Sequence, residues 1–299
     1  MRLVRFTFLG RPGPYLGLIA DGEETVRDLT ATSAPGCPLP WLRHLLRNRD
    51  RAVREFAAAA RLAPVVGTLA ELEASRSLLP PVDCPEVWAA GVTYERSRDA
   101  RDRETQVGGA GGTAYDRVYA AERPELFFKA TGPRVRGTGA EVGLRGDSRW
   151  QVPEPELGLV LDEDGTILGY TLGNDMSSRD IEGENPLYLP QAKIYRCACA
   201  LGPAVLPAAG AAPAVFPIGC RVLRNGAEAW SGETDTGHMR RGFAELVGYL
   251  RRHNWIPAGT VLLTGTGLVP PDDFTLQAGD TVEITSPTIG TLRNTAAWV

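Results

Sequence analysis

The segment spanning residues 154–180 constrains the fold more than any other part of this 299-residue chain. It reads EPELGLVLDEDGTILGYTLGNDMSSRD. The apolar run LGLVL predicts a buried strand, residues 162–165 predict a turn, and TILGYTLG predicts a strand that returns beside the first. The chain is therefore expected to fold around one β-hairpin.

Acidic side chains gather at one end of this hairpin. Glu154 and Glu156 are two residues apart, a spacing that places both carboxylates on one face of a strand. If the turn is centred on residues 162–165, Gly173 faces Glu154, and Asp175 lies two residues further on, on the same face. Like charges that close repel unless a cation lies among them. Hard oxygen ligands without His or Cys favour Mg²⁺, or else Mn²⁺, over zinc.

The spacing alone also allows a plainer interpretation. Hairpin ends are often acidic, and three carboxylates at such an end can simply be solvated. A metal site and a polar turn are both open at this point.

Composition excludes several other classes of protein. The net charge is −4 and no basic block occurs, which argues against a nucleic-acid or anionic-membrane partner. No stretch reaches the roughly 18 apolar residues of a membrane span. The five cysteines are odd in number and form no C-x-x-C pair, so a reducing cytoplasm is expected.

Lysine is unusually rare in this chain. Of 32 basic residues only Lys129 and Lys193 are lysines, and the rest are arginines. The two residue types do not interchange where chemistry needs an amine that can lose a proton or a compact charge. Both lysines are therefore candidates for chemical work, although they could also be chance surface residues.

The remaining sequence predicts a small N-terminal domain and a larger catalytic domain. Residues 1–32 read as short strands and residues 40–61 as a helix, while the proline-rich stretch at 78–87 reads as a linker. The boundary is accordingly placed between residues 1–80 and 81–299. Many short strands and few helices predict an α+β fold that is predominantly β. A glycine cluster at 108–112 suggests a lid over residues 98–114.

Several motifs together resemble the fumarylacetoacetate hydrolase (FAH) family. They are E-P-E, G-N-D-M-S-S-R-D, a lysine after P-Q-A, then L-G-P and T-G-T, and the resemblance covers roughly residues 85–299. The stretches GVTYERS, RPELFFKA and KIYRCACALGP look like the branch that contains 2-keto-3-deoxy-D-arabinonate dehydratase. The resemblance implies a mixed β-roll catalytic domain behind a small N-terminal α/β domain. It also implies Mg²⁺ on Glu154, Glu156 and Asp175, and a homodimer or homotetramer.

The chain departs from the family pattern in one loop. The hydrolases of the family carry a His and a Glu there to activate water, whereas this chain has GVTYERSRDAR, with Ser97 at the His position. Of the other histidines, His238 is the candidate for a base or a substrate contact. The missing pair favours a lyase over a C–C bond hydrolase.

The implied chemistry is the dehydration of a 2-keto-3-deoxy sugar acid through a metal-stabilised enolate. Lys193 is the expected base or enolate partner, Glu125 the acid for the departing hydroxyl, and Lys129 a residue that orients it or the substrate. Candidate substrate contacts are Ser97, Arg179, Thr266 and His238. Two alternatives stay open: a hydrolase or decarboxylase of an acylpyruvate-like diketo acid, and a non-catalytic protein that binds oxo acids.

Overall fold

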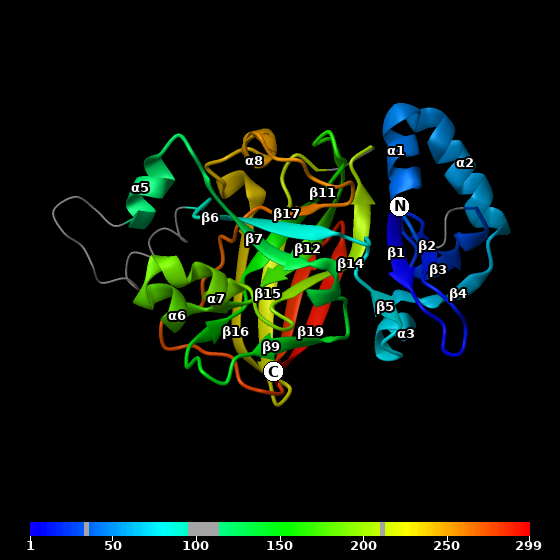
Figure 1. Cartoon of the computed structure of the whole chain (residues 1–299). Helices are drawn as coiled ribbons and strands as arrows, with labels where there is room; N and C mark the ends of the chain where they lie inside the picture. The colour runs from blue at the N-terminus through cyan, green and yellow to red at the C-terminus, as the bar shows by residue number, and fades with distance from the viewer. Residues whose placement is uncertain (33–35, 95–113, 210–212) are drawn as a thin grey trace.

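The computed structural model describes residues 1–32, 36–94, 114–209 and 213–299 (Figure 1). Its main element is a twelve-stranded sheet. The order along it is β4 (Val65–Thr68), β3 (Thr25–Asp28), β2 (Tyr15–Ile19), β1 (Arg2–Phe6), β14 (Cys199–Pro207), β12 (Ile167–Asp175), β11 (Pro155–Leu161), β17 (Val261–Leu263), β6 (Glu86–Gly91) and β7 (Glu125–Thr131). β5 (Leu78–Leu79) pairs with β1, and β8 (Val135–Arg136) pairs with β14.

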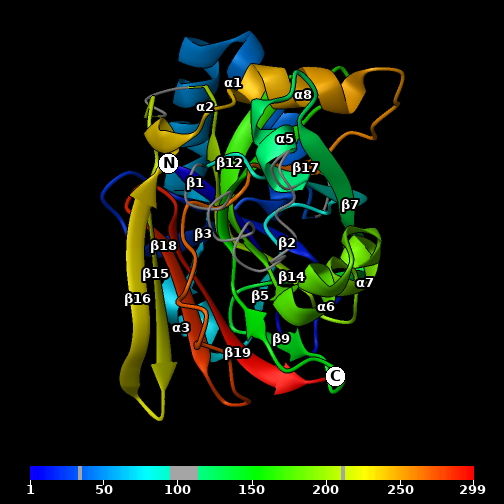
Figure 2. The ribbon, with the colours of Figure 1, turned by 90° about the vertical axis from the view of Figure 1, so that its left-hand side faces the viewer.

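A second sheet packs against the first (Figure 2). Its five strands follow the order β16 (Ala227–Asp235), β15 (Pro217–Arg224), β18 (Thr281–Ser286), β19 (Gly290–Trp298) and β9 (Glu141–Leu144). β10 (Gln151–Val152) and β13 (Ser177–Ser178) form a small separate ribbon. Most pairs are antiparallel, but β8–β14, β17–β6 and β19–β9 are parallel. These mixed sheets confirm the predicted α+β class with strands dominant.

The helices are short and lie around the sheets. They are α1 (Leu39–Arg47), α2 (Arg49–Leu62), α3 (Leu69–Ala74), α5 (Ala114–Ala120), α6 (Arg179–Glu184), α7 (Leu189–Lys193) and α8 (Phe243–Arg251). Figure 1 shows α1 and α2 beside the N-terminal strands, whereas α6 and α7 lie at the opposite side of the molecule. Within the described ranges, every helix is too short or too polar to cross a lipid bilayer.

The helix expected over residues 40–61 is two helices. Asn48 lies between them with φ −145° and ψ 54°, values outside the helical region, and its N–H donates to His44 O. Periodicity alone could not show this break, because the apolar positions on both sides of Asn48 still pack into one core. Leu42, Leu45 and Phe56 all lie in the same buried cluster.

The central hairpin consists of β11 and β12, and β11 is buried on both faces. Leu157 and Leu159 pack into the core between the two sheets, while Val160 packs into a second core shared with the N-terminal helices. A strand covered on both faces reads as a continuous apolar run, which explains the LGLVL sequence.

The predicted register of this hairpin was wrong by two residues. Glu156, not Glu154, pairs with Gly173, and the pairing shifts between Val160 and Leu161. The turn is centred later in the chain than predicted, since Asp162 N–H donates to Thr166 O at 2.9 Å, and the irregularity at Val160 and Leu161 supplies the rest of the shift. A shift of two keeps every side chain on its predicted face.

The N-terminal segment is joined to the rest of the structure by a sheet and a core. β1 continues the large sheet through Leu3, which pairs with Val205 of β14. Arg43 of α1 donates to Asp162 in the hairpin turn at 2.8 Å, and this hydrogen bond lowers the pKa of the Asp162 carboxyl. The division into domains 1–80 and 81–299 stays a prediction, and the shared core supplies a way to test it.

We expect Leu45→Ala to lower the free energy of unfolding by about 2–5 kcal/mol, because Leu45 is fully buried in the core shared with β11. Its exposed neighbour supplies the control: Leu46→Ala should change stability by less than about 0.5 kcal/mol. Urea unfolding followed by circular dichroism should show one cooperative transition that shifts as a whole. Two transitions, of which Leu45→Ala moves only the first, would show that residues 1–80 unfold independently.

Candidate active site

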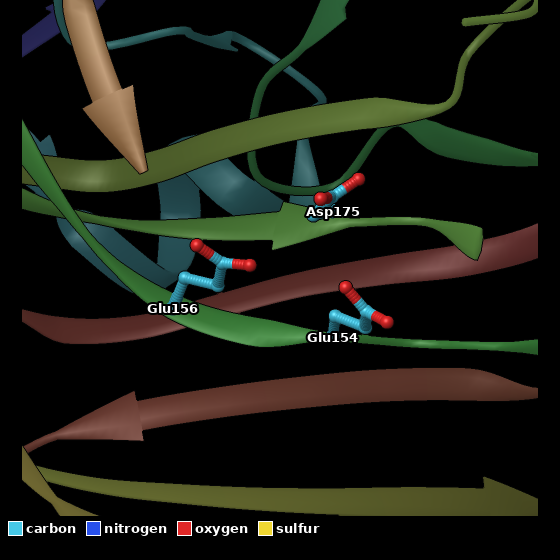
Figure 3. Close-up of side chains that lie close together, drawn as sticks. All are labelled: Glu154, Glu156 and Asp175. Carbon is cyan, nitrogen blue, oxygen red and sulfur yellow. The ribbon is translucent and has the colours of Figure 1, made fainter. Parts of the chain in front are cut away.

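The three carboxylates predicted from the hairpin converge on one space (Figure 3). Glu154 and Glu156 extend from the β11 side of the hairpin and Asp175 from the end of β12. Each side chain has an oxygen within 4.8 Å of an oxygen of the others. Asp175 N–H donates to Glu154 O at 3.0 Å, so these two residues lie opposite one another rather than diagonally. The corrected register therefore brings the carboxylates closer than the predicted one.

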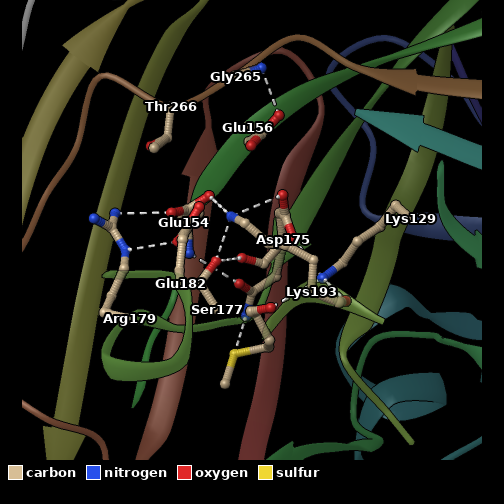
Figure 4. A network of polar contacts seen from close by, with 12 residues as sticks. Lys129, Glu154, Glu156, Asp175, Ser177, Arg179, Glu182, Lys193, Gly265 and Thr266 are labelled. Atoms are coloured by element: carbon tan, nitrogen blue, oxygen red, sulfur yellow. Dashed lines mark hydrogen bonds and ion pairs between the residues drawn. The ribbon is translucent and has the colours of Figure 1, made fainter. Parts of the chain in front are cut away.

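Glu154 is held by two cations. Its Oε1 accepts a hydrogen bond from Arg179 Nη2 at 2.8 Å, and its Oε2 accepts one from Lys193 Nζ at 2.6 Å (Figure 4). Arg179 begins α6 and Lys193 ends α7, so the segment after the hairpin supplies both groups. All three side chains are at most 3% exposed, and in such surroundings a charge needs a partner of opposite sign.

Asp175 is held by both lysines of the chain. Its Oδ1 lies 2.5 Å from Lys129 Nζ and its Oδ2 lies 3.3 Å from Lys193 Nζ. Lys129 Nζ also donates to Met176 O at 2.9 Å and to Lys193 O at 2.5 Å. Lys129 is thus placed to fix Asp175 and the end of α7. Neither lysine is a surface residue, because both are at most 1% exposed.

Glu156 depends on the backbone of Gly265. Gly265 N–H donates to Glu156 Oε2 at 2.5 Å. Gly265 has a φ of +92°, and a Cβ there would lie 2.0 Å from Thr93 Oγ1, so no larger residue fits. Burial raises the pKa of the Glu156 carboxyl well above its ordinary value, and the charges of Asp175 and Glu154 raise it further.

The arrangement fits a divalent cation with oxygen ligands. Three buried carboxylates with no His or Cys among them are the donor set that Mg²⁺ or Mn²⁺ prefers. Burial is the main cause of the raised pKa of Glu156, followed by the charges of Asp175 and Glu154, and a cation among the three carboxylates would favour its charged form. The solvated-acid interpretation does not hold, since all three carboxylates are buried.

A small cavity opens onto this cluster. Besides the three carboxylates, its walls are Ala90, Gly91, Val92, Phe127 and Thr266. The Phe127 ring lies 5.6 Å from Lys193 Nζ, close enough for a cation–π contact. Thr266, one of the predicted substrate contacts, is present in the wall, but its Oγ1 already accepts a hydrogen bond from Leu268 N–H at 3.1 Å.

Glu125 lies against Gly91, one of the residues that line this cavity. It begins β7 and pairs with Gly91 of β6. A Cβ on Gly91 would lie 2.0 Å from Glu125 Oε2, so the glycine gives this carboxylate its place beside the cavity wall. The predicted acid is therefore near the site, and its role stays a prediction.

His238 lies away from the carboxylate cluster in this structure. Its side chain is 72% exposed, and its Nδ1 lies 3.0 Å from Asp235 Oδ1. Ser97 lies outside the described residues, and so does nearly all of the predicted lid at 98–114. The roles predicted for them remain predictions.

Sequence reasoning missed three contributors to the site. Ser177 Oγ accepts a hydrogen bond from Lys193 Nζ at 2.6 Å, Gly265 holds Glu156, and Glu182 is fully buried beside Arg179. Ser177 and Glu182 follow the hairpin directly, but a serine or an acid in a short helix has no spacing that marks it as buried. Gly265 lies in the T-G-T motif, of which only Thr266 was predicted to contact the substrate.

Comparisons with known proteins agree with this geometry. Residues 103–297 match the family model described as fumarylacetoacetate (FAA) hydrolase C-terminal. The chain is 45% identical over 270 residues to a Haloferax volcanii protein named probable 2-keto-3-deoxyxylonate dehydratase, covering 85% of this chain and 92% of that protein. The chain belongs to the fumarylacetoacetate hydrolase family. Its carboxylate cluster lies within the matched region.

Two further relatives lie in the same part of the family. The 2-dehydro-3-deoxy-D-arabinonate dehydratase of Saccharolobus solfataricus is 47% identical over 213 residues, which cover 71% of this chain and 72% of that protein. A solved structure titled 2-keto-3-deoxy-D-arabinonate dehydratase complexed with magnesium and 2,5-dioxopentanoate superimposes with a TM-score of 0.83 at 36% identity. That match covers 100% of this chain and 99% of the other.

We expect Glu156→Gln to weaken Mg²⁺ binding strongly while the fold persists, because the amide keeps the shape and loses the charge. Thermal unfolding in EDTA should occur at the same temperature as in the native protein or higher, since a repulsion with Glu154 and Asp175 is removed. Added Mg²⁺ should raise the unfolding temperature of the native protein. It should raise the unfolding temperature of the variant by much less. An equal rise in both proteins would exclude Glu156 as a ligand.

Proposed function

We propose that this protein is a Mg²⁺-dependent dehydratase that acts on a 2-keto-3-deoxy sugar acid. The observation that carries the proposal is the buried cluster of Glu154, Glu156 and Asp175, with Lys193 against two of them, in the wall of a small cavity. The names of the relatives, three of them dehydratases of keto-deoxy sugar acids, support the choice of substrate class.

Glu154, Glu156 and Asp175 would hold the metal ion. A bound Mg²⁺ polarises the 2-keto group of such a substrate and stabilises the negative charge that develops on its oxygen. Lys129 and Arg179 keep Asp175 and Glu154 in place, since each contributes a hydrogen bond or ion pair to an oxygen of one carboxylate. Thr266 and Phe127 form the wall against which the substrate lies.

Lys193 is the group we assign to the proton at C3. Its Nζ lies between Glu154 and Asp175, beside Phe127 of the cavity wall. The amine must be neutral to accept that proton, and a divalent cation held by the same carboxylates would disfavour its charged form. The C3–H electron pair then becomes part of a carbon–carbon double bond while the proton is held at the amine.

Glu125 is the group we assign to the hydroxyl at C4. Its contact with Gly91, which lines the cavity, supports this assignment, in which Glu125 donates a proton to the departing oxygen. The C4–O bond breaks, water leaves, and a 2-keto acid with a C3–C4 double bond remains. Loss of a proton from C5 and gain of one at C3 convert it to the C4–C5 enol, which tautomerises to the semialdehyde. One proton and one hydroxide are removed, so the product differs from the substrate by one water molecule.

The assembly and the compartment are also proposals. We retain a homodimer or homotetramer, which the family resemblance favours, and several apolar side chains such as Leu187 and Trp298 are exposed in this single chain. A reducing cytoplasm is favoured because each of the five cysteines is a free thiol. Gel filtration with light scattering would decide the first point.

A substrate panel tests the proposed reaction. In the presence of Mg²⁺ the purified protein should convert one or more 2-keto-3-deoxy pentonates to a semialdehyde, or hexonates to a 2,5-diketo acid, with no C–C cleavage. EDTA should abolish turnover until Mg²⁺ is restored. Mass spectrometry should show the loss of one water. Pyruvate formation from acylpyruvates would instead support the hydrolase alternative. Ligand binding without turnover of any panel member would support the non-catalytic one.

We expect Lys193→Arg to lower kcat on the order of a hundredfold or more, the usual scale for the loss of a general base. A guanidinium keeps the charge and the approximate reach but stays protonated at any working pH. KM should change much less. Near-normal kcat with a raised KM would show that Lys193 only anchors the substrate.

A further inference from the structure

Glu182 is a buried acid to which the proposed reaction gives no role. It lies in α6, its side chain is 0% exposed, and its Oε2 is 3.9 Å from Nε of Arg179 on the same helix. The same guanidinium donates from Nη2 to Glu154 Oε1 at 2.8 Å. Figure 4 shows both carboxylates beside the guanidinium of Arg179. One cation is therefore shared by a proposed metal ligand and by an acid that is not one.

This sharing changes the charge that a metal ion would meet. A guanidinium whose charge served only Glu154 would neutralise that ligand and oppose the binding of a divalent cation nearby. Glu182 attracts part of the same charge, so Glu154 remains a stronger anion. With all groups ionised, four buried carboxylates (Glu154, Glu156, Asp175 and Glu182) face three buried cations (Lys129, Arg179 and Lys193), which leaves one negative charge in favour of a cation.

We propose that Glu182 is a positioning residue that strengthens metal binding through Arg179. It holds the guanidinium beside Glu154 and offsets its charge. Partners that orient metal ligands in this way typically change metal affinity by about 10–100-fold. The inference rests on the metal site of the proposed function, but it does not depend on which keto acid is the substrate.

A purely structural role for Glu182 makes a different prediction. Buried ion pairs are weak evidence for stability, and loss of one partner leaves the other charge without compensation. If Glu182 served only the packing of α6, its replacement would lower stability equally with and without metal and leave the affinity of the folded protein for metal unchanged. If it acts on the metal site, the affinity changes and the metal-induced stabilisation shrinks.

Glu182→Gln, which keeps the shape of the side chain and removes its charge, is the decisive variant. We expect its Mn²⁺ dissociation constant, measured by electron paramagnetic resonance of free Mn²⁺ without substrate, to rise about 10–100-fold. The rise in unfolding temperature on adding Mg²⁺ should be smaller than in the native protein. The control is Glu184→Gln, a loss of charge at an exposed position of the same helix, which should bind Mn²⁺ normally.

Unchanged Mn²⁺ affinity in folded Glu182→Gln would overturn the inference. If that variant does not fold, Glu182→Asp decides instead, because it keeps the charge but withdraws it from Arg179. A several-fold loss of affinity then supports the inference, and native affinity contradicts it. If the native protein itself binds no Mn²⁺, the metal site of the proposed function fails together with this inference. Tight native binding that Glu182→Gln leaves unchanged overturns only the inference.

Discussion

The structure depends on the close approach of three carboxylates in a place from which water is excluded. Glu154, Glu156 and Asp175 could not lie together without cations, because each disfavours the charged form of the others. Lys193 supplies part of the compensation by bonding to Glu154 and Asp175 at once. Lys129 and Arg179 supply the rest from the outer side of the cluster. The remaining negative charge is the property that a divalent cation would use.

The fold holds these side chains because the hairpin that carries them is the middle of the large sheet. β11 lies between β12 and β17 and is covered by apolar cores on both faces, so its side chains have little freedom. The segment that leaves β12 then forms α6 and α7, which return Arg179 and Lys193 to the carboxylates. The rigid strand pair thus positions the three carboxylates, and the short helices α6 and α7 position the basic side chains of Arg179 and Lys193.

The sequence predicted the acids well, and for a physical reason. The two-residue spacing of Glu154 and Glu156 places both side chains on one face of the strand. A register error of two residues keeps Asp175 on that face, so the predicted cluster was correct although the predicted pairing was not. Arginine usage likewise pointed to Lys129 and Lys193, because lysines that survive such a bias are rarely replaceable. The rarity of lysine could not show which groups each lysine contacts, for example that Lys129 contacts Asp175 and the end of α7. Glu182 was missed because its burial arises from tertiary packing alone.

If the carboxylate cluster binds a divalent cation, anomalous diffraction from crystals grown with Mn²⁺ should locate that ion. The account predicts one strong anomalous peak bounded by Glu154, Glu156 and Asp175, with Arg179 still hydrogen-bonded to Glu154. A map with no peak at this position, and with Lys193 Nζ still bound to both Glu154 and Asp175 at saturating Mn²⁺, would contradict it.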